Sequence, residues 1–379
     1  MKLDLASRWL GGSVLAASDE SFGFKETLLV PAAPDFTPGR YDHRGEIVDG
    51  WETRRRRGEP GHDWAIVRLG APGVIDEIDV DTRFFTGNYP PACRIEACGM
   101  EGYPRVAELT GPEAEWAEIV PLSPLRGDGH NLFAVADRRR FTHIRLSIHP
   151  DGGIARLRVR GEVVPDPRHW DGLTVDLACQ EQGGLVVDSS DSFYSSAELL
   201  NRPDRARTMG EGWETSRRRD PGHDFAVIRL AATGRLRQIE IDTSHFKYNA
   251  SAEVELSGAA STEPRDLDWF PVLPRTPVTP DTRHLFTLPT TSAPLTTVRI
   301  DAFPDGGISR VRLVGTPEPA ARLRAGLHWF NALPASQAAH CLAVAGVPEP
   351  DLARVLAARP LTSLEAVPEI LTTWLTGRL

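Results

Sequence analysis

The chain has 379 residues, of which 41% are hydrophobic and 25% are charged, as in a globular protein of two or three domains. Its formal net charge of −9 argues against nucleic acid as a general partner, because phosphate binding needs a basic surface. Charged residues interrupt the N-terminal segment, and no run of about 18 apolar residues occurs, so neither a signal peptide nor a membrane span is expected. Four scattered cysteines favour a cytoplasmic location.

The first half of the chain predicts β-strands separated by turns. Residues 64–69, 78–80 and 144–148 have the apolar spacing of strands, and no long helical pattern lies between them. The segments WETRRRR (51–57) and PDGGI (150–154) fall between strands and are expected on loops. Loops on a rigid β-sandwich are a common place for a functional site. This half of the chain therefore predicts a β-sandwich or jelly roll.

The second half of the chain repeats the first. Four blocks recur in the same order: 49–69 with 211–230, 73–88 with 234–249, 130–135 with 283–288, and 142–161 with 296–315. The unit is far longer than a solenoid repeat, which indicates duplication of a whole domain. We expect domains at 1–165 and 166–318, and a short helical tail at 319–379 in which prolines separate the helices.

The arginine-rich loop has two interpretations. Four consecutive arginines (54–57) are compatible with a solvated turn, or with a pocket for an anionic substrate, since guanidinium binds carboxylate in a bidentate way. Recurrence of the run in the second copy indicates that its spacing matters. It does not separate substrate binding from a network of structural ion pairs.

Several other recurring polar residues also have two interpretations. His62 and His223 lie in a PGHD turn and could be a base, a metal ligand or neither. Asp81 ends a strand and could cap a turn or belong to a site. The glycines of the PDGG turns, which precede Arg156 and Arg310, more often serve backbone geometry than phosphate binding. The sequence contains no GxxxxGK, HExxH, paired CxxC or GxSxG motif.

The doubled block WETRRRR…GHDW (51–64) and WETSRRR…GHDF (213–225), with DT.FFTGNYPP (81–91), resembles the allantoicase family. The opening residues 5–23 are similar to that family's N-terminus. The resemblance covers about residues 3–316. It implies an all-β fold of two tandem galactose-binding-like jelly rolls, a homo-oligomer, and hydrolysis of allantoate to ureidoglycolate and urea. The tail at 327–367 resembles the first helices of the ureidoimidazoline decarboxylase family but stops before its active-site segment, so no decarboxylase activity is expected.

Allantoate carries one carboxylate and two ureido groups, so its site needs a cation, hydrogen-bonding groups and a base for water. We expect the working site in the first copy, because the second has Ser216 in place of Arg54 and lacks the GNYP stretch. Whether a divalent metal takes part is left open. A non-catalytic binding module and a structural or regulatory subunit are the alternative functions. The predicted catalytic residues are Glu52, Asp63 and Asp81; the predicted substrate-binding residues are Arg54, Arg55, Arg56, His62, Asn88, Arg156, Glu214, Arg217 and His223.

Overall fold

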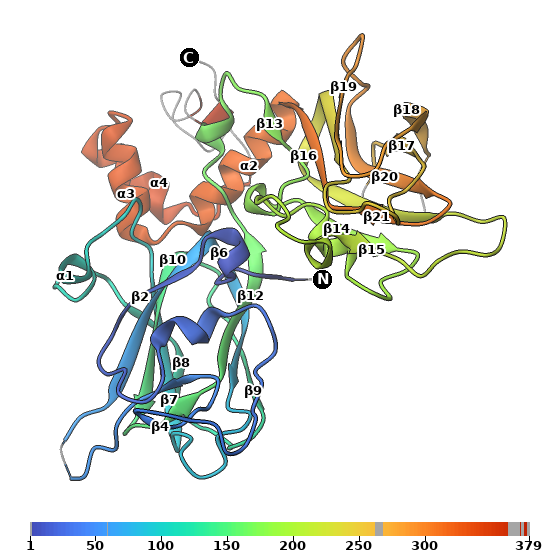
Figure 1. Cartoon of the computed structure of the whole chain (residues 1–379). Coiled ribbons are helices and arrows are strands. Elements are labelled where there is room, and N and C mark those ends of the chain that lie inside the picture. Colours follow the sequence, from blue (N-terminus) through green and yellow to red (C-terminus); the bar gives the residue numbers. More distant parts are fainter. Residues whose placement is uncertain (1, 59, 262–267, 363–371, 373–374, 377–379) are drawn as a thin grey trace. The chain divides into compact units, whose positions relative to one another are not determined.

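Each repeat is organised around one long strand. In the computed structural model, which describes residues 2–58, 60–261, 268–362, 372 and 375–376, these strands are β6 (Asp63–Asp81) and β16 (Asp224–Asp242), each of 19 residues (Figure 1). The strands predicted at 64–69 and 78–80 are therefore two halves of one strand. The described residues form two compact units, one built on each repeat.

Strand β6 pairs with different neighbours along its length. Its first half lies between β2 (Ser13–Ala17) and β10 (Arg140–His149), and its second half lies between β9 (His130–Ala134) and β12 (Arg156–Val163). The pairing shifts near Gly73, where an added Cβ atom would lie 2.1 Å from the Glu162 carbonyl oxygen. The long strand therefore joins two sets of strands around one core.

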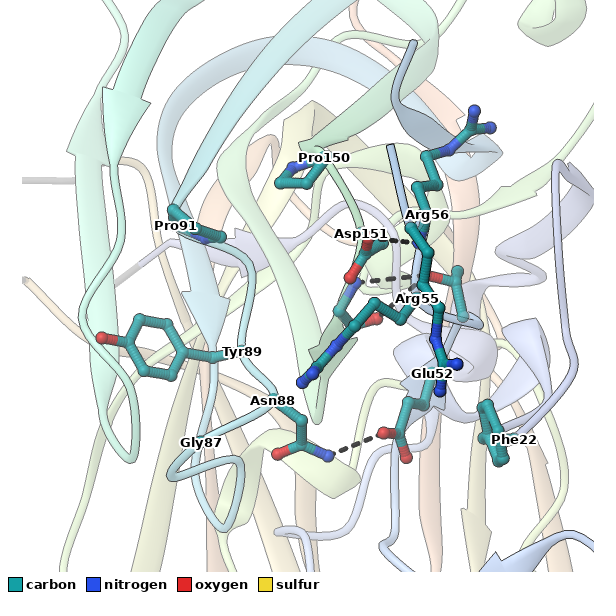
Figure 2. Close-up of a pocket in the computed structure, with 13 residues that line it drawn as sticks. Phe22, Glu52, Arg55, Arg56, Gly87, Asn88, Tyr89, Pro91, Pro150 and Asp151 are labelled. Carbon is teal, nitrogen blue, oxygen red and sulfur yellow. Dashed lines mark hydrogen bonds between the residues drawn. The ribbon is translucent and has the colours of Figure 1, made fainter. Parts of the chain in front are cut away.

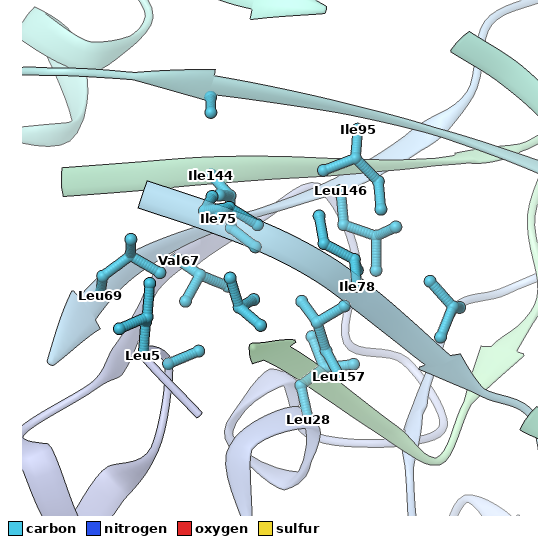
Figure 3. Packing of buried hydrophobic residues seen from close by; sticks show 14 of the residues in the cluster. Leu5, Leu28, Val67, Leu69, Ile75, Ile78, Ile95, Ile144, Leu146 and Leu157 are labelled. Carbon is cyan, nitrogen blue, oxygen red and sulfur yellow. The ribbon is translucent and has the colours of Figure 1, made fainter. Parts of the chain in front are cut away.

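Alternating side chains of β6 supply this core. Val67 and Ile78 are completely buried and pack with Leu146 of β10 and Leu157 of β12, as Figure 3 shows. Burying a side chain of this kind contributes roughly 1.5–3 kcal/mol. The core fixes the strands, and the loops at their ends are held in place by them.

The remaining strands of the first unit complete its sheets. They are β1 (Leu3–Asp4), β3 (Tyr41–Asp42), β4 (Gly45–Glu46), β5 (Trp51–Glu52), β7 (Ala92–Cys98), β8 (Ala117–Pro124) and β11 (Gly153–Ile154). One short helix, α1 (Val106–Leu109), precedes β8.

The second unit has the same sheet order as the first, which confirms the internal repeat. Its other strands are β13 (Val175–Asp176), β14 (Leu185–Ser189), β15 (Trp213–Glu214), β17 (Glu253–Ala259), β18 (Phe270–Pro277), β19 (Arg283–Thr287), β20 (Leu295–Phe303), β21 (Gly307–Ile308) and β22 (Arg310–Pro317). A mostly β architecture with two tandem sheet units follows.

The predicted helices of the tail are present in its described part. They are α2 (Pro319–Ala332), α3 (Ala335–Val344) and α4 (Glu349–Ala357), and Pro334 and Pro348 precede α3 and α4 as expected. Residues 330–360 belong to the first compact unit, where Ser336 donates a hydrogen bond of 2.7 Å to Glu115. Among the described helices, none is both long and apolar enough to cross a membrane.

Candidate functional site

A pocket of about 520 Å³ lies where three loops of the first unit meet. The loops are the arginine run after β5, the stretch 87–91 between β6 and β7, and the turn 150–152 before β11 (Figure 2). Strands β5 and β11 pair with each other, which places Glu52 opposite Gly153. The segments singled out separately in the sequence thus form one site.

The arginine loop is anchored at its base by Trp51. This side chain is completely buried, and its indole Nε1 donates a hydrogen bond of 2.8 Å to the Asp19 carbonyl oxygen. Farther along, the backbone N–H of Arg56 donates to Asp151 Oδ2 at 2.7 Å, and the Thr53 hydroxyl accepts from the backbone N–H of Gly152 at 3.1 Å. These contacts fix the loop against the turn that faces it.

Glu52 is the half-buried acid of this pocket. The side-chain amide of Asn88 donates a hydrogen bond of 2.7 Å to its Oε1 (Figure 2). Burial raises the pKa of the Glu52 carboxyl above its ordinary value, and the Asn88 hydrogen bond opposes this rise. A raised pKa makes this carboxylate a stronger base than an exposed glutamate.

Arg55 and Arg57 bring positive charge to the same pocket. Both side chains are exposed, and neither makes a hydrogen bond or ion pair with another side chain in the described part of the protein. Their guanidinium groups are therefore available to an anionic ligand. Arg56 also lines the pocket, but its Nε and Nη2 donate to Asp63 at 3.1 and 2.9 Å.

The structure places four of the nine sequence-predicted residues of the first repeat in the pocket; these are Glu52, Arg55, Arg56 and Asn88. Arg54 is exposed and lies outside it, with its Nε 3.6 Å from Asp19. His62 stacks on His149 with ring centroids 4.4 Å apart and lines a different pocket.

Asp63, Asp81 and Arg156 also lie outside the pocket, each held in a buried pair. Asp63 accepts from Arg56, and Asp81 accepts from both Nε and Nη2 of Arg83. Arg156 is 1% exposed, pairs with Asp49 and donates to the Ala32 carbonyl oxygen at 3.0 Å. Each contact supplies the partner that a buried charge needs, and none of the three side chains lines the pocket.

The second repeat forms an equivalent pocket of about 750 Å³. Glu214 and Arg217 line it, and Asn249 donates to Glu214 Oε1 at 2.6 Å. The altered stretch at 248–251 thus keeps the Asn–Glu pair that the first repeat has. His223 lies outside this pocket, with its Nε2 2.8 Å from Asp301.

The second pocket differs from the first in its walls. Tyr248 replaces Gly87 and is 95% exposed, Ala250 replaces Tyr89, and Tyr194 stands in the position of Phe22. The two pockets share their acid, their amide and two of their arginines but present different shapes to a ligand.

Sequence reasoning did not assign Phe22, Tyr89 or Asp151 to the site. Asp151 lies in the PDGG turn that recurs in both copies, and this recurrence was the available signal. Phe22 follows β2 and is distant in sequence from the rest of the pocket. It reaches the pocket because its neighbour Gly23 forms a β-bridge with Glu52.

The carboxylates of the first pocket are Glu52 and Asp151. Carboxylate oxygens are the ligands that hard divalent cations use. Among the described residues, however, no group of three or more histidine, cysteine, aspartate and glutamate side chains is arranged to hold a metal ion. Chelation tests whether a metal takes part.

Comparison with known proteins gives one consistent result. The allantoicase repeat, as a family, matches residues 3–164 and 175–318. A "Probable allantoicase" of Nocardia farcinica is 52% identical over 312 residues, spanning 82% of this chain and 93% of that protein. One from Streptomyces coelicolor is 49% identical over 337 residues, with 85% and 88% covered. The crystal structure of allantoicase from Saccharomyces cerevisiae superposes with a TM-score of 0.70 at 34% identity, covering 83% of this chain and 93% of that one.

Proposed function

Because this chain belongs to the allantoicase family of hydrolases, we propose that it splits allantoate into ureidoglycolate and urea in the first-repeat pocket. The observation that carries this assignment of the site is the Glu52–Asn88 pair beside the guanidinium of Arg55, which has no side-chain partner among the described residues. One acid, one amide and one cation match the base, the ureido contact and the carboxylate contact that the substrate needs.

In this proposal Arg55 binds the substrate carboxylate. Glu52 takes a proton from a water molecule whose oxygen bonds to the methine carbon of allantoate. The bond from this carbon to one ureido nitrogen breaks, and the proton held by Glu52 passes to that nitrogen, so that urea leaves. The raised pKa of Glu52 supports both the uptake and the release of the proton.

Asn88 has a positioning role in the proposed site. Its hydrogen bond to Oε1 holds the Glu52 carboxylate in one orientation. The amide oxygen of Asn88 is then turned away from Glu52, where it can accept a hydrogen bond from a ureido N–H group.

The test is urea release from allantoate by the full-length protein and by Glu52→Gln. We expect the variant to lose roughly 10²- to 10⁴-fold in kcat, the usual contribution of a general base. Glu214→Gln, the matched change in the second repeat, should leave most of the turnover. Full turnover by Glu52→Gln would remove Glu52 from the mechanism. No turnover by the folded wild-type protein would favour a binding role instead.

The same assay with a chelator addresses the metal. Loss of activity on chelation, with recovery on adding a divalent cation, would make Glu52 and Asp151 its candidate ligands. Activity that resists chelation would leave Glu52 as a base acting on free water.

We also propose, on the family resemblance, that each sheet unit is a galactose-binding-like jelly roll and that the protein is a homo-oligomer. The two sets of strands joined by β6 support the first of these. Light scattering coupled to gel filtration tests the second, and a monomeric mass would contradict it. The decarboxylase-like origin of the tail stays a prediction, and part of that segment lies outside the described residues.

A further inference from the structure

A second pocket of the first repeat, of about 410 Å³, is lined by cationic and aromatic side chains. Its lining includes Arg56, His62, Trp64, Arg94, Thr110 and Arg145. Except for Arg56, these residues are absent from the lining of the proposed ureide pocket. The sequence analysis had assigned only Arg56 and His62, and to a different role.

Arg94 carries an uncompensated charge in this pocket. Its Nε atom is buried without a hydrogen-bond partner, and the guanidinium forms no ion pair within the described residues. Arg145, by contrast, is bound to Glu96 with a 2.8 Å hydrogen bond. A buried guanidinium nitrogen without a partner is costly, and this cost is removed if a ligand supplies the acceptor.

Near Arg94 lie two further buried polar atoms that have no hydrogen-bond partner in the part of the chain that the structure describes. They are Oγ of Ser147, which is opposite Arg94 across the β7–β10 pair, and Nε2 of His149, whose ring stacks on His62. The pKa of His62 is lowered by burial and by the charges of Arg94, Arg56 and Arg145. The arginines of this pocket therefore already disfavour the protonated form of the neighbouring His62.

The second repeat has acidic residues at the equivalent positions of its sheet. On the same strand pair, Glu255 and Asp301 occupy the positions of Arg94 and Ser147. Asp301 accepts hydrogen bonds of 2.8 Å from Arg299 Nε and also contacts His223 at 2.8 Å. The first repeat thus has Arg94 and Ser147 at the positions where the second repeat has the acids Glu255 and Asp301.

We infer that the first repeat carries a separate binding site for a small oxyanion, a carboxylate or phosphate group, in the place that Asp301 fills in the second repeat. The oxyanion accepts from the guanidinium of Arg94, which lines the pocket, and the side chains of Trp64 and His62 border it. The pocket volume limits the ligand to a small molecule.

The site is tested by calorimetric titration of the full-length protein with inorganic phosphate and, separately, with malonate. Arg94→Glu, which copies the residue of the second repeat, should weaken binding of the preferred anion by about tenfold or more, since charge-assisted hydrogen bonds are lost. Arg229→Glu is the matched control, because it makes the same charge change at an exposed position of the other repeat. It should leave the affinity within about twofold, the scale of weak surface electrostatics.

The two anions identify which oxyanion chemistry the site prefers. Failure of both to bind, or equal binding by wild-type protein and Arg94→Glu, would overturn the inference. A folded Arg94→Glu protein that loses both anion binding and urea release would also overturn the inference, because the pocket would then belong to the ureide site. The binding readout does not depend on turnover, so it remains decisive if allantoate is not the substrate.

Discussion

The side-chain amide of Asn88 donates a 2.7 Å hydrogen bond to the carboxylate of Glu52, and Asn249 does the same to Glu214 at 2.6 Å. Both pairs connect a loop after the long strand with a two-residue strand that precedes it. Conservation of this contact between two repeats with different surroundings indicates that the orientation of the acid is constrained in each pocket.

Asn88→Ala should shift the acidic limb of the pH–rate profile to higher pH. The Asn88 hydrogen bond lowers the pKa of Glu52, so its removal lets burial raise that pKa further. A base must be deprotonated to act, and kcat/KM will therefore fall at low pH while recovering at higher pH. The measurement is kcat/KM against pH. Asn249→Ala serves as the control and should leave the limb in place; an unshifted limb in Asn88→Ala would contradict the role of Glu52 as base.

Arg55→Ala and Arg54→Ala should separate the two neighbouring arginines. Arg55 lines the pocket without a side-chain partner among the described residues, whereas Arg54 lies outside it near Asp19. Losing a charge-assisted contact of about 1.5–3 kcal/mol raises KM for allantoate by roughly ten- to a hundredfold in Arg55→Ala. We expect less than about threefold in Arg54→Ala, as for an exposed ion pair. Steady-state kinetics with allantoate make the comparison, and equal effects would argue against a specific carboxylate contact.

Arg156→Ala should weaken the fold rather than substrate binding. The guanidinium is buried against Asp49 and donates to backbone carbonyl oxygens, which would be left without a donor. Removing one partner of a buried pair costs about 3–5 kcal/mol, and because 32% of the Asp49 side chain is exposed we expect the lower end, about 3 kcal/mol. Urea denaturation measures the free energy of unfolding. A raised KM with unchanged stability would restore Arg156 to the substrate site.

His143 should make the first repeat sensitive to acid. Burial lowers the pKa of His143 to about 4, while an unfolded histidine titrates near 6.5. Between these values the unfolded chain binds a proton that the folded chain does not, so stability falls as pH drops below about 6.5. The difference between pH 7 and pH 5 amounts to about 2 kcal/mol.

His143→Thr, which introduces the residue found at 297 in the second repeat, tests this dependence. The variant should lose less stability between pH 7 and pH 5 than the wild-type protein does, when both are followed by urea denaturation. An identical pH dependence in the two proteins would show that other groups cause it.

The duplication and the strand positions could be predicted from the sequence because they rest on local patterns. Recurrent blocks and alternating apolar residues appear without knowledge of the fold. Glu52 and Asn88 were predicted separately, and the fold brings them together.

Local patterns do not show which residues pair with Asp63, Asp81 and Arg156 in the folded chain. Arg156 meets Asp49, which lies 107 positions earlier, and the pairing of β5 with β11 beside them brings their surroundings together. Recurrence in both copies could not distinguish a structural pair from a catalytic group, since duplication preserves both. Phe22 lies outside the four recurring blocks that the sequence analysis compared, and it enters the site through the bridge of Gly23 to Glu52.

Each pocket takes its walls from a single repeat, and this has a consequence for how the protein could change over time. Copying one domain copied an entire binding site, not half of one. A substitution in one pocket, such as a change at Gly87 or Tyr248, leaves the lining of the other pocket as it was. The paired architecture therefore allows a new ligand specificity to arise beside the old one within the same gene.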